Sequence, residues 1–144
     1  MFLGEYQHSI DEKGRLAVPA QFRSALKRGA VITRGLDRCL FVFQKESWQG
    51  LAKKLVSLSL ARANSRAFNR LIFSGAIAVD FDAQGRMLVP DYLREYAGLK
   101  KQAIITGLYN RLEIWDEILW QKYKERTEAA SDDIAERLGE LGII

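Results

Sequence analysis

Apolar and polar residues alternate in two short stretches of the chain that lie 71 residues apart. Tyr6, His8 and Ile10 occupy every second position of the first stretch, and the apolar residues of 77–81 do the same in the second. A period of two places these side chains on one face of a β-strand. The pattern therefore predicts one half-buried strand in each half of the chain.

A turn and a shorter strand follow each stretch. Asp at the first position and Gly at the fourth, found at 11–14 and again at 82–85, are typical of a type I turn. In the strand after the first turn, Leu16 and Val18 lie on one face and Arg15 lies on the other. Each turn therefore places an arginine opposite the apolar face of the strand that follows.

Short helices and hairpins complete the pattern. Pro19 and Pro90 precede apolar residues at helical spacing, and proline is favourable at the start of a helix because its fixed φ suits the first turn. Apolar runs within residues 30–43 and 103–115 then predict one hairpin in each half. The order strand, turn, strand, helix and hairpin thus occurs twice.

The two halves are copies of one unit. Residues 2–23 match residues 73–94 at eight of 22 positions. Because a unit of about 45 residues buries too little surface to fold alone, we expect the two copies to complete one core. The predicted fold class is α+β, mainly β, with two tandem units forming one pseudo-two-fold β-barrel core with short helices. The predicted segments are a first unit at 5–47, a helical connector at 48–74, a second unit at 76–119, and a C-terminal helix with an acidic tail at 120–144.

Two further segments have helical spacing. Apolar residues recur every three to four positions between 46 and 73 and again after Asp116, which is a suitable N-cap residue. Arg62, Arg66 and Arg70 form one stripe on the first of these segments. That stripe is a solvated helix face, a second anion-binding surface or a contact between subunits.

The distribution of charge favours an anionic partner. The net charge is +4 and the pI is near 9.3, and residues 1–58 hold ten Lys and Arg against five Asp and Glu. A basic half of this kind favours nucleic acid. No apolar run reaches the ~18 residues of a membrane span, and the first residues lack the pattern of a secretory signal. The single cysteine, Cys39, fits a reducing cytosol.

The sequence lacks the constellations of an enzyme. Glycine-rich nucleotide-binding loops and the His-Glu-x-x-His zinc motif are absent. The only histidine, His8, is expected at the edge of the core, and Cys39 is expected to pack in a hairpin. We therefore expect no catalytic residue, no metal site, no cofactor and no small-molecule substrate.

The arginine after each turn is the residue that turn geometry does not require. Arg15 projects from the start of a strand, on the face opposite Leu16. Its guanidinium can bind guanine O6 and N7 in a major groove, which β-ribbons enter, or it can clamp a phosphate. It can equally form an ion pair with Asp11 that only locks the turn. The residue types leave both interpretations open.

The two copies differ in charge. Residues 11–28 contain five basic and two acidic side chains, whereas residues 82–99 contain two basic and three acidic ones. Phosphate contacts dominate the affinity of proteins for DNA. The first copy is therefore predicted to be the main DNA surface, with Arg15 contributing most and Arg86 assisting.

Several segments resemble one known family. The opening Met-Phe-Leu-Gly-Glu-Tyr, the motifs Asp-Glu-Lys-Gly-Arg and Asp-Ala-Gln-Gly-Arg, and the run Leu-Glu-Ile-Trp-Asp at 112–116 are similar to the MraZ family, over nearly the whole chain. The resemblance implies two tandem SpoVT-AbrB-like, swapped-hairpin domains. It also implies a bacterial transcriptional regulator, usually a repressor, of the cell-division and cell-wall gene cluster that encodes it.

The resemblance further implies partners and a site. Members bind short promoter repeats in double-stranded DNA as ring-like homo-oligomers, are cytoplasmic and nucleoid-associated, and contact DNA through the motif arginine. Together with the basic residues near the first turn, the expected DNA-binding residues are Lys13, Arg15, Arg23, Lys27 and Arg86, and the turn-forming residues are Asp11, Gly14, Asp82 and Gly85. The alternative is an AbrB-fold protein-interaction or antitoxin-like module without a promoter target.

Overall fold

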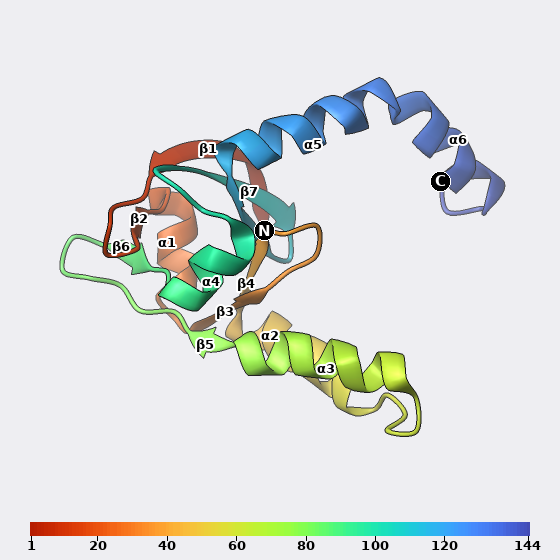
Figure 1. Ribbon diagram of the computed structural model, residues 1–144, viewed down its shortest axis with the longest axis horizontal. Coiled ribbons are helices and arrows are strands. Elements are labelled where there is room, and N and C mark those ends of the chain that lie inside the picture. The colour runs from red at the N-terminus through yellow and green to blue at the C-terminus, as the bar shows by residue number, and fades with distance from the viewer.

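Two antiparallel β-sheets form the centre of the molecule (Figure 1). The computed structural model describes residues 1–144 and contains a six-stranded sheet with the order β1-β7-β8-β4-β3-β5 and a two-stranded ribbon of β2 and β6. The strands are β1 (Phe2–Ser9), β2 (Arg15–Ala17), β3 (Ala30–Arg34), β4 (Leu40–Gln44), β5 (Ile77–Ala78), β6 (Arg86–Leu88), β7 (Gln102–Tyr109) and β8 (Leu112–Asp116). The helices are α1 (Ala20–Leu26), α2 (Lys45–Val56), α3 (Ala63–Gly75), α4 (Asp91–Ala97), α5 (Glu117–Ala129) and α6 (Ser131–Glu140). This mixed α+β architecture agrees with the predicted class.

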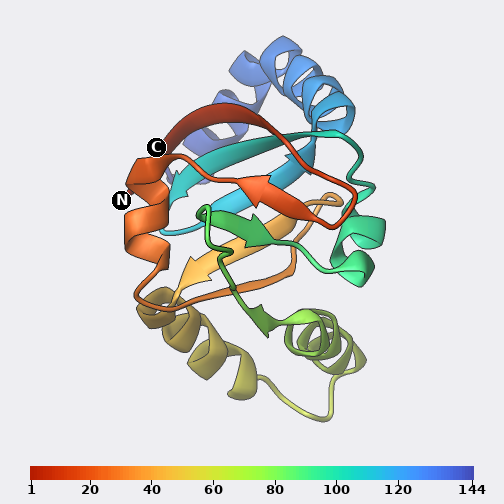
Figure 2. The same ribbon diagram turned by 90° about the vertical axis from the view of Figure 1, so that its left-hand side faces the viewer.

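Strands of the first repeat pair with strands of the second. β1 pairs with β7, so that Gly4 lies opposite Gly107, and β5 pairs with β3. In the ribbon, Leu16 of β2 lies opposite Met87 of β6. Figure 2 shows this ribbon in front of the larger sheet. Neither repeat therefore completes its β-structure alone, as the small size of the unit predicted.

The expectation of a closed β-barrel is wrong. β1 and β5 each pair with a single neighbour, so the six-stranded sheet has two edges. The pairs Ile10–Leu16 and Phe81–Met87 are isolated bridges and not continuous ladders. A barrel closes only when every strand pairs on both sides. β5 has two residues and each ribbon strand has three, so these strands are too short to close the sheet into a barrel.

The second alternating stretch forms less strand than its pattern predicted. β5 ends at Ala78, and Ile77 is 43% exposed, although the Val79 N–H still donates to the Ala30 carbonyl at 2.9 Å. β1, by contrast, pairs with β7 along all eight of its residues. β3 has five residues, of which only Val31 and Ile32 pair with β5.

A single hydrophobic core joins both repeats. Leu16 and Met87, which face each other in the ribbon, are both 0% exposed, and the core around them also contains apolar side chains of α1 and α4. Burying a side chain of this size contributes about 1.5–3 kcal/mol. The two faces predicted for β2 are confirmed, since Leu16 and Val18 are buried while Arg15 is partly exposed.

Helices α2 and α3 form a helical hairpin beside the sheet, in the segment whose spacing predicted helices. Trp48 of α2 packs edge-on against Phe73 of α3, with ring centroids 5.8 Å apart. The Asn69 side chain donates to the Leu55 carbonyl at 3.0 Å and ties the end of α2 to α3.

The C-terminal helices begin at a capping residue. The Asp116 carboxylate accepts from the N–H groups of Ile118 and Leu119 at 3.1 and 3.3 Å, so the N-cap predicted for α5 is confirmed. Trp120 of α5 packs on Trp115 of β8, with centroids 5.3 Å apart. Beyond it, α6 lies away from the sheets and none of its residues is buried (Figure 1). No helix combines the length and the apolar character that crossing a membrane requires.

Candidate nucleic-acid interface

The first turn, residues 11–14, is held by its own backbone and by one carboxylate. The Gly14 N–H donates to the Asp11 carbonyl at 3.0 Å, which is the hydrogen bond of a β-turn. The Asp11 Oδ1 atom accepts from the backbone N–H groups of Lys13 and Arg15 at 3.0 and 2.9 Å. Gly14 has a φ of 84°, which glycine adopts without strain. Asp11 thus ties together three positions of the turn.

The second turn, residues 82–85, has the same geometry. The Gly85 N–H donates to the Asp82 carbonyl at 3.0 Å, and φ of Gly85 is 77°. The Asp82 Oδ1 atom accepts from the backbone N–H groups of Gln84 and Arg86, both at 2.9 Å. The two repeats therefore build their turns with the same hydrogen bonds.

Each motif arginine forms an ion pair with the aspartate of its own turn. Arg15 Nε lies 2.6 Å from Asp11 Oδ2, and Arg86 Nε lies 2.8 Å from Asp82 Oδ2. This is the contact that the turn-locking interpretation predicted. In Arg15 it engages Nε alone, and the terminal amino groups make no hydrogen bond within the protein. Locking the turn and offering a guanidinium edge to DNA are therefore compatible.

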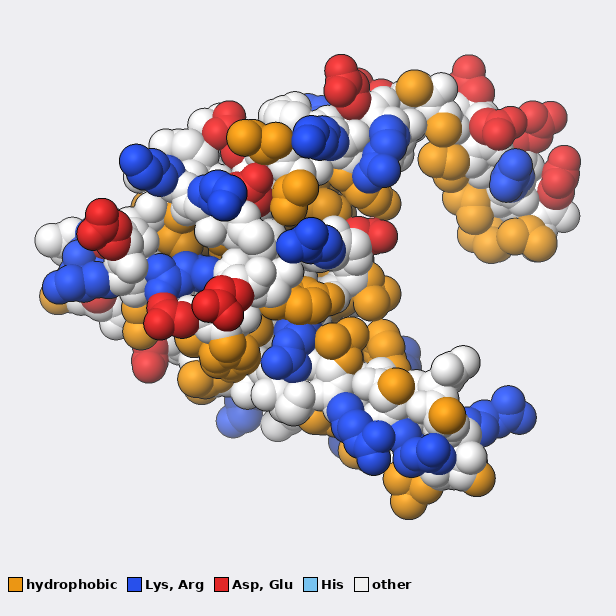
Figure 3. Space-filling model, viewed as in Figure 1, with side chains coloured by type: hydrophobic (Ala, Val, Ile, Leu, Met, Phe, Trp, Pro, Cys, Tyr) orange, Lys and Arg blue, Asp and Glu red, His pale blue; other side chains and the backbone are white.

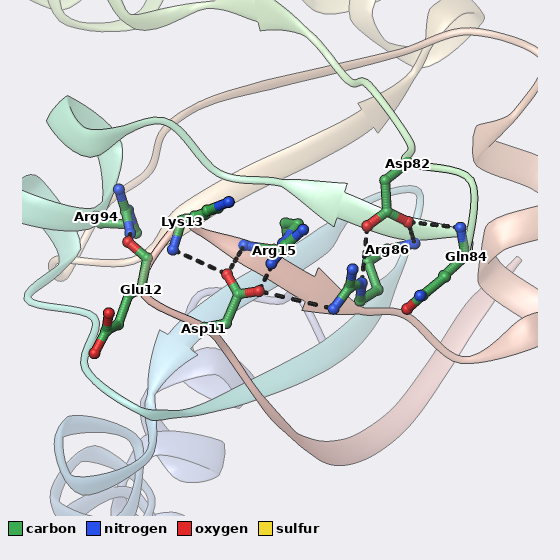
Figure 4. Close-up of polar contacts among 8 residues, drawn as sticks. All are labelled: Asp11, Glu12, Lys13, Arg15, Asp82, Gln84, Arg86 and Arg94. Carbon is green, nitrogen blue, oxygen red and sulfur yellow. Dashed lines mark hydrogen bonds and ion pairs between the residues drawn. The ribbon is translucent and has the colours of Figure 1, made fainter.

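Arg86 also approaches the aspartate of the other repeat. Its Nη1 atom lies 3.7 Å from Asp11 Oδ2, so that Asp11 faces two guanidinium groups (Figure 4). No matching ion pair joins Arg15 to Asp82. The motif arginines thus belong to one surface and not to two separate ones. Which of them contributes more to binding stays a prediction.

The carboxylates of both turns are ionised at neutral pH. The backbone N–H of Arg15, together with its guanidinium, lowers the pKa of Asp11 below the ordinary value, and Arg86 lowers the pKa of Asp82 in the same way. Each carboxylate neutralises part of the charge of the adjacent arginine. Lys13, exposed on the first turn, makes no ion pair.

Two further arginines pack on the turns of the opposite repeats. Arg23 of α1 covers Gly85 so closely that a side chain there would lie 2.9 Å from its Nη1 atom. Arg94 of α4 covers Gly14 and donates from Nη1 to the Glu12 carbonyl at 3.0 Å. Sequence reasoning did not single out Arg94 as a site residue. The signal for it was its match to Arg23 in the repeat.

The five expected DNA-binding residues lie in different settings. Lys13 stands on the first turn, and Arg15 and Arg86 lie on the ribbon. Arg23 was expected on the surface of the first copy but lies against the second turn. Lys27 is exposed at the C-cap of α1 and bonds to neither turn. The structure therefore brings four of the five residues to the ribbon and its turns, and leaves Lys27 at the far end of α1.

Groups that could act as nucleophiles or ligands lie elsewhere. Cys39 is fully buried, its Sγ atom lies 3.1 Å from the Leu36 carbonyl, and burial raises the pKa of the thiol well above its ordinary value. His8 is partly buried in β1, opposite Ala103. No three His, Cys, Asp or Glu side chains cluster as a metal site would require. A buried, protonated thiol is a poor nucleophile.

A comparison with known protein families finds the same match in each half of the chain. A family model described as "MraZ protein, putative antitoxin-like" matches residues 1–71 and matches again over residues 72–140. The chain belongs to the MraZ family. The two MraZ matches begin 71 residues apart, which is also the spacing of the two turns. The tandem duplication read from the sequence is therefore confirmed.

Relatives in the MraZ family align with almost the whole chain. The transcriptional regulator MraZ of Syntrophomonas wolfei is 49% identical over 143 residues, which are 99% of this chain and 100% of the relative. That of Heliobacterium modesticaldum is 50% identical over 138 residues, 96% of each chain. That of Thermomicrobium roseum is 48% identical over 141 residues, 98% of this chain and 99% of the relative. These relatives are named as regulators and not as enzymes, which supports the expectation that this chain is not an enzyme.

Proposed function

We propose that this chain is a sequence-specific DNA-binding transcriptional regulator that reads DNA with the β2–β6 ribbon and its two turns. The observation that carries the proposal is the pair Arg15 and Arg86, held on one ribbon with side chains 34% and 28% exposed. A two-stranded ribbon fits a major groove about 12 Å wide, where an arginine can bind one guanine through two hydrogen bonds.

The distribution of charge supports an approach of DNA to the ribbon and not to the C-terminal arm. Acidic side chains gather on α6, at the end of the C-terminal arm, whereas α3 carries basic ones (Figure 3). The tail includes Asp132, Asp133, Glu136 and Glu140. DNA phosphates are repelled by such a surface and attracted to cations such as Lys13.

The target genes and the direction of regulation are proposed from membership of the MraZ family. We propose that this chain represses the cell-division and cell-wall gene cluster that encodes it, and that it binds short repeats in the promoter of that cluster. The proposed location is the cytoplasm, in association with the nucleoid. The relatives' names support regulation of transcription.

Ring-like self-assembly is part of this proposal. A single reading surface with few phosphate contacts gives a Kd of about 10⁻⁴ to 10⁻⁶ M without sequence preference. Identical surfaces on one assembly, meeting repeated sites, gain roughly 10² to 10⁴ in avidity. Exposed apolar residues at and beyond the end of α2 support a protein contact there, since Val56 is 69% and Leu60 is 79% exposed.

We propose that the chain is divided into four segments. These are a first unit at 5–47, a helical connector at 48–74, a second unit at 76–119 and a C-terminal arm at 120–144. We further propose that an approximate two-fold axis relates the units. The matched bridges Ile10–Leu16 and Phe81–Met87 support that relationship.

Footprinting with transcription in vitro tests the proposed function. The purified chain is added to a template that carries the region upstream of its own gene. We expect protection of repeated short sites and lower transcript yield at the same protein concentrations. A template with the repeats scrambled is the control. Equal protection of both templates, or no protection, would contradict sequence-specific regulation.

The α5–α6 arm favours a second candidate, a protein-interaction or antitoxin-like module. α6 lies away from the sheets, and Ile134 on this helix and Leu141 just after it are 42% and 73% exposed. Affinity capture from a lysate treated with nuclease tests this function. One stoichiometric protein partner, together with equal affinity for promoter and scrambled DNA, would favour the module over the regulator.

A further inference from the structure

Arg23 and Arg94 occupy matched positions in the two repeats, and each covers the turn glycine of the other repeat. Arg23 projects from α1 over Gly85, and Arg94 projects from α4 over Gly14. The crossed arrangement follows from the ribbon, because β2 and β6 pair in opposite directions and bring each helix to the partner's turn. Neither turn is therefore held by its own repeat alone.

One hydrogen bond ties Arg94 to the first turn, and an ion pair anchors its guanidinium within its own repeat. Its Nη1 donates to the Glu12 carbonyl at 3.0 Å, and its Nη2 forms an ion pair with Asp91 at the start of α4. The side chain is 18% exposed. A backbone bond of 2.8 Å from the Val89 N–H to the Gly14 carbonyl fixes the same turn from the second repeat.

Arg23 lacks this anchoring. Its side chain makes no hydrogen bond or ion pair, although its guanidinium packs on Gly85. The position that matches Asp91 in the first repeat is Ala20, an exposed residue at the start of α1. The first repeat therefore has no carboxylate to orient Arg23, and the two turns are held with unequal firmness.

We propose that Arg94 is a positioning residue, which holds the first turn from the second repeat so that Lys13 and Arg15 meet DNA already ordered. Arg23 has the same role for the second turn, with weaker anchoring. This inference rests on the proposed DNA-binding function. Its physical basis is preorganisation, since a loop that is ordered before binding does not have to be ordered during binding.

The alternative is that Arg94 only stabilises the fold. The two roles differ in how Arg94 combines with Lys13. If Arg94 acts through the turn, its loss weakens DNA binding less when Lys13, one of the two cations that it positions, is already absent, and the two substitutions are non-additive. If Arg94 only supports the fold, its loss lowers the melting temperature and leaves the DNA affinity of the folded fraction unchanged.

A double-mutant cycle separates these roles. Arg94→Met keeps the apolar stem and removes the guanidinium, and Lys13→Ala removes the turn cation. Affinity for a labelled duplex from the chain's own upstream region is measured at a temperature at which circular dichroism shows every variant folded. We expect Arg94→Met to weaken binding about tenfold in the wild-type background and less than about threefold in the Lys13→Ala background. Equal losses in both backgrounds, or no loss, would overturn the proposal.

The missing carboxylate offers a gain-of-function test. Ala20→Asp supplies the first repeat with the counterpart of Asp91, and Asp91→Ala removes that residue from the second. Amide hydrogen exchange of the free protein is expected to slow at Gln84 and Gly85 in the first variant and to quicken at Lys13 and Gly14 in the second. Unchanged exchange in both variants would contradict the positioning role.

The exchange readout needs no DNA. If the wild-type chain fails to bind the duplex, the proposed function fails, while the exchange rates still decide whether Arg94 holds the turn. If wild type binds and Arg94→Met binds equally well, the positioning proposal fails alone.

Discussion

The Nη1 atom of Arg86, in the second repeat, lies 3.7 Å from Oδ2 of Asp11 in the first. Asp11 consequently neighbours both motif arginines, whereas Asp82 neighbours only Arg86. The two turns are alike in sequence and in backbone hydrogen bonding, but their aspartates thus differ in the number of arginines that they contact. The inequality predicts different results for substitutions that the repeat alone would make equivalent.

Asp11→Asn is expected to reduce sequence specificity more than Asp82→Asn, because it loosens two guanidinium groups and Asp82→Asn loosens one. Both substitutions add net positive charge, so affinity for any DNA rises. The informative quantity is the ratio of affinities for promoter and scrambled duplexes, expected to fall about tenfold for Asp11→Asn. Anisotropy titrations with both duplexes measure it. An equal or larger fall for Asp82→Asn would count against the shared role of Asp11.

Arg15→Ala is expected to weaken promoter binding more than Arg86→Ala. The terminal amino groups of Arg15 are free, whereas those of Arg86 include one that faces Asp11. An arginine that contacts a base contributes about 1–3 kcal/mol, and one that contacts phosphate changes the salt slope by about one. Titrations between about 50 and 200 mM salt separate the two contributions. A larger loss for Arg86→Ala would reverse the predicted ranking.

Gly14→Ala is expected to destabilise the protein more than Gly85→Ala. Both residues have positive φ, 84° and 77°, which costs an alanine about 1–2 kcal/mol. At Gly14 the new Cβ would also collide with the backbone carbonyl of Val89, whereas at Gly85 it first meets the Arg23 side chain, which can move. Urea unfolding is expected to show losses of about 1–2 kcal/mol for Gly85→Ala and about 3 kcal/mol or more for Gly14→Ala. Equal losses would contradict the unequal crowding.

Acidification is expected to weaken the fold through the turn carboxylates. The pKa values of Asp11 and Asp82 are lowered in the folded protein, so their stabilising effect is fully present above the unfolded value of about 3.9 and is lost as pH falls through the folded value. Urea midpoints measured from about pH 6 to pH 3 should therefore fall less steeply when both residues are replaced by Asn. If the urea midpoint of this double variant had the same pH dependence as that of wild type, the turn carboxylates would not contribute to the loss of stability in acid.

Local patterns in the sequence predicted the elements that depend on neighbouring residues. The two faces of β2, the hairpins and the capping of α5 by Asp116 are determined by alternation and by side chains within a few positions. The internal repeat predicted a shared core, because one unit buries too little apolar surface. The family match over both halves agrees with that organisation.

Features that depend on contacts between the repeats could not be predicted in the same way. The short β5 and the open sheet depend on pairing between strands that are distant in the sequence, which no local pattern encodes. Arg23 was expected on the surface of the first copy because of its position in the sequence. The pairing of β2 with β6 instead brings it to the second turn. The contact of Arg86 with Asp11 has the same origin.

DNA reading by the ribbon arginines is tested most directly by the affinity of an Arg15→Ala/Arg86→Ala double variant for the duplex upstream of its own gene. Arg137→Ala is the matched control, since Arg137 lies on α6 and is 78% exposed. We expect the double variant to lose the preference for promoter over scrambled DNA and to bind at least about 100-fold more weakly, while the control binds like wild type. Promoter binding by the folded double variant within about twofold of wild type would contradict the claim that the ribbon arginines read DNA.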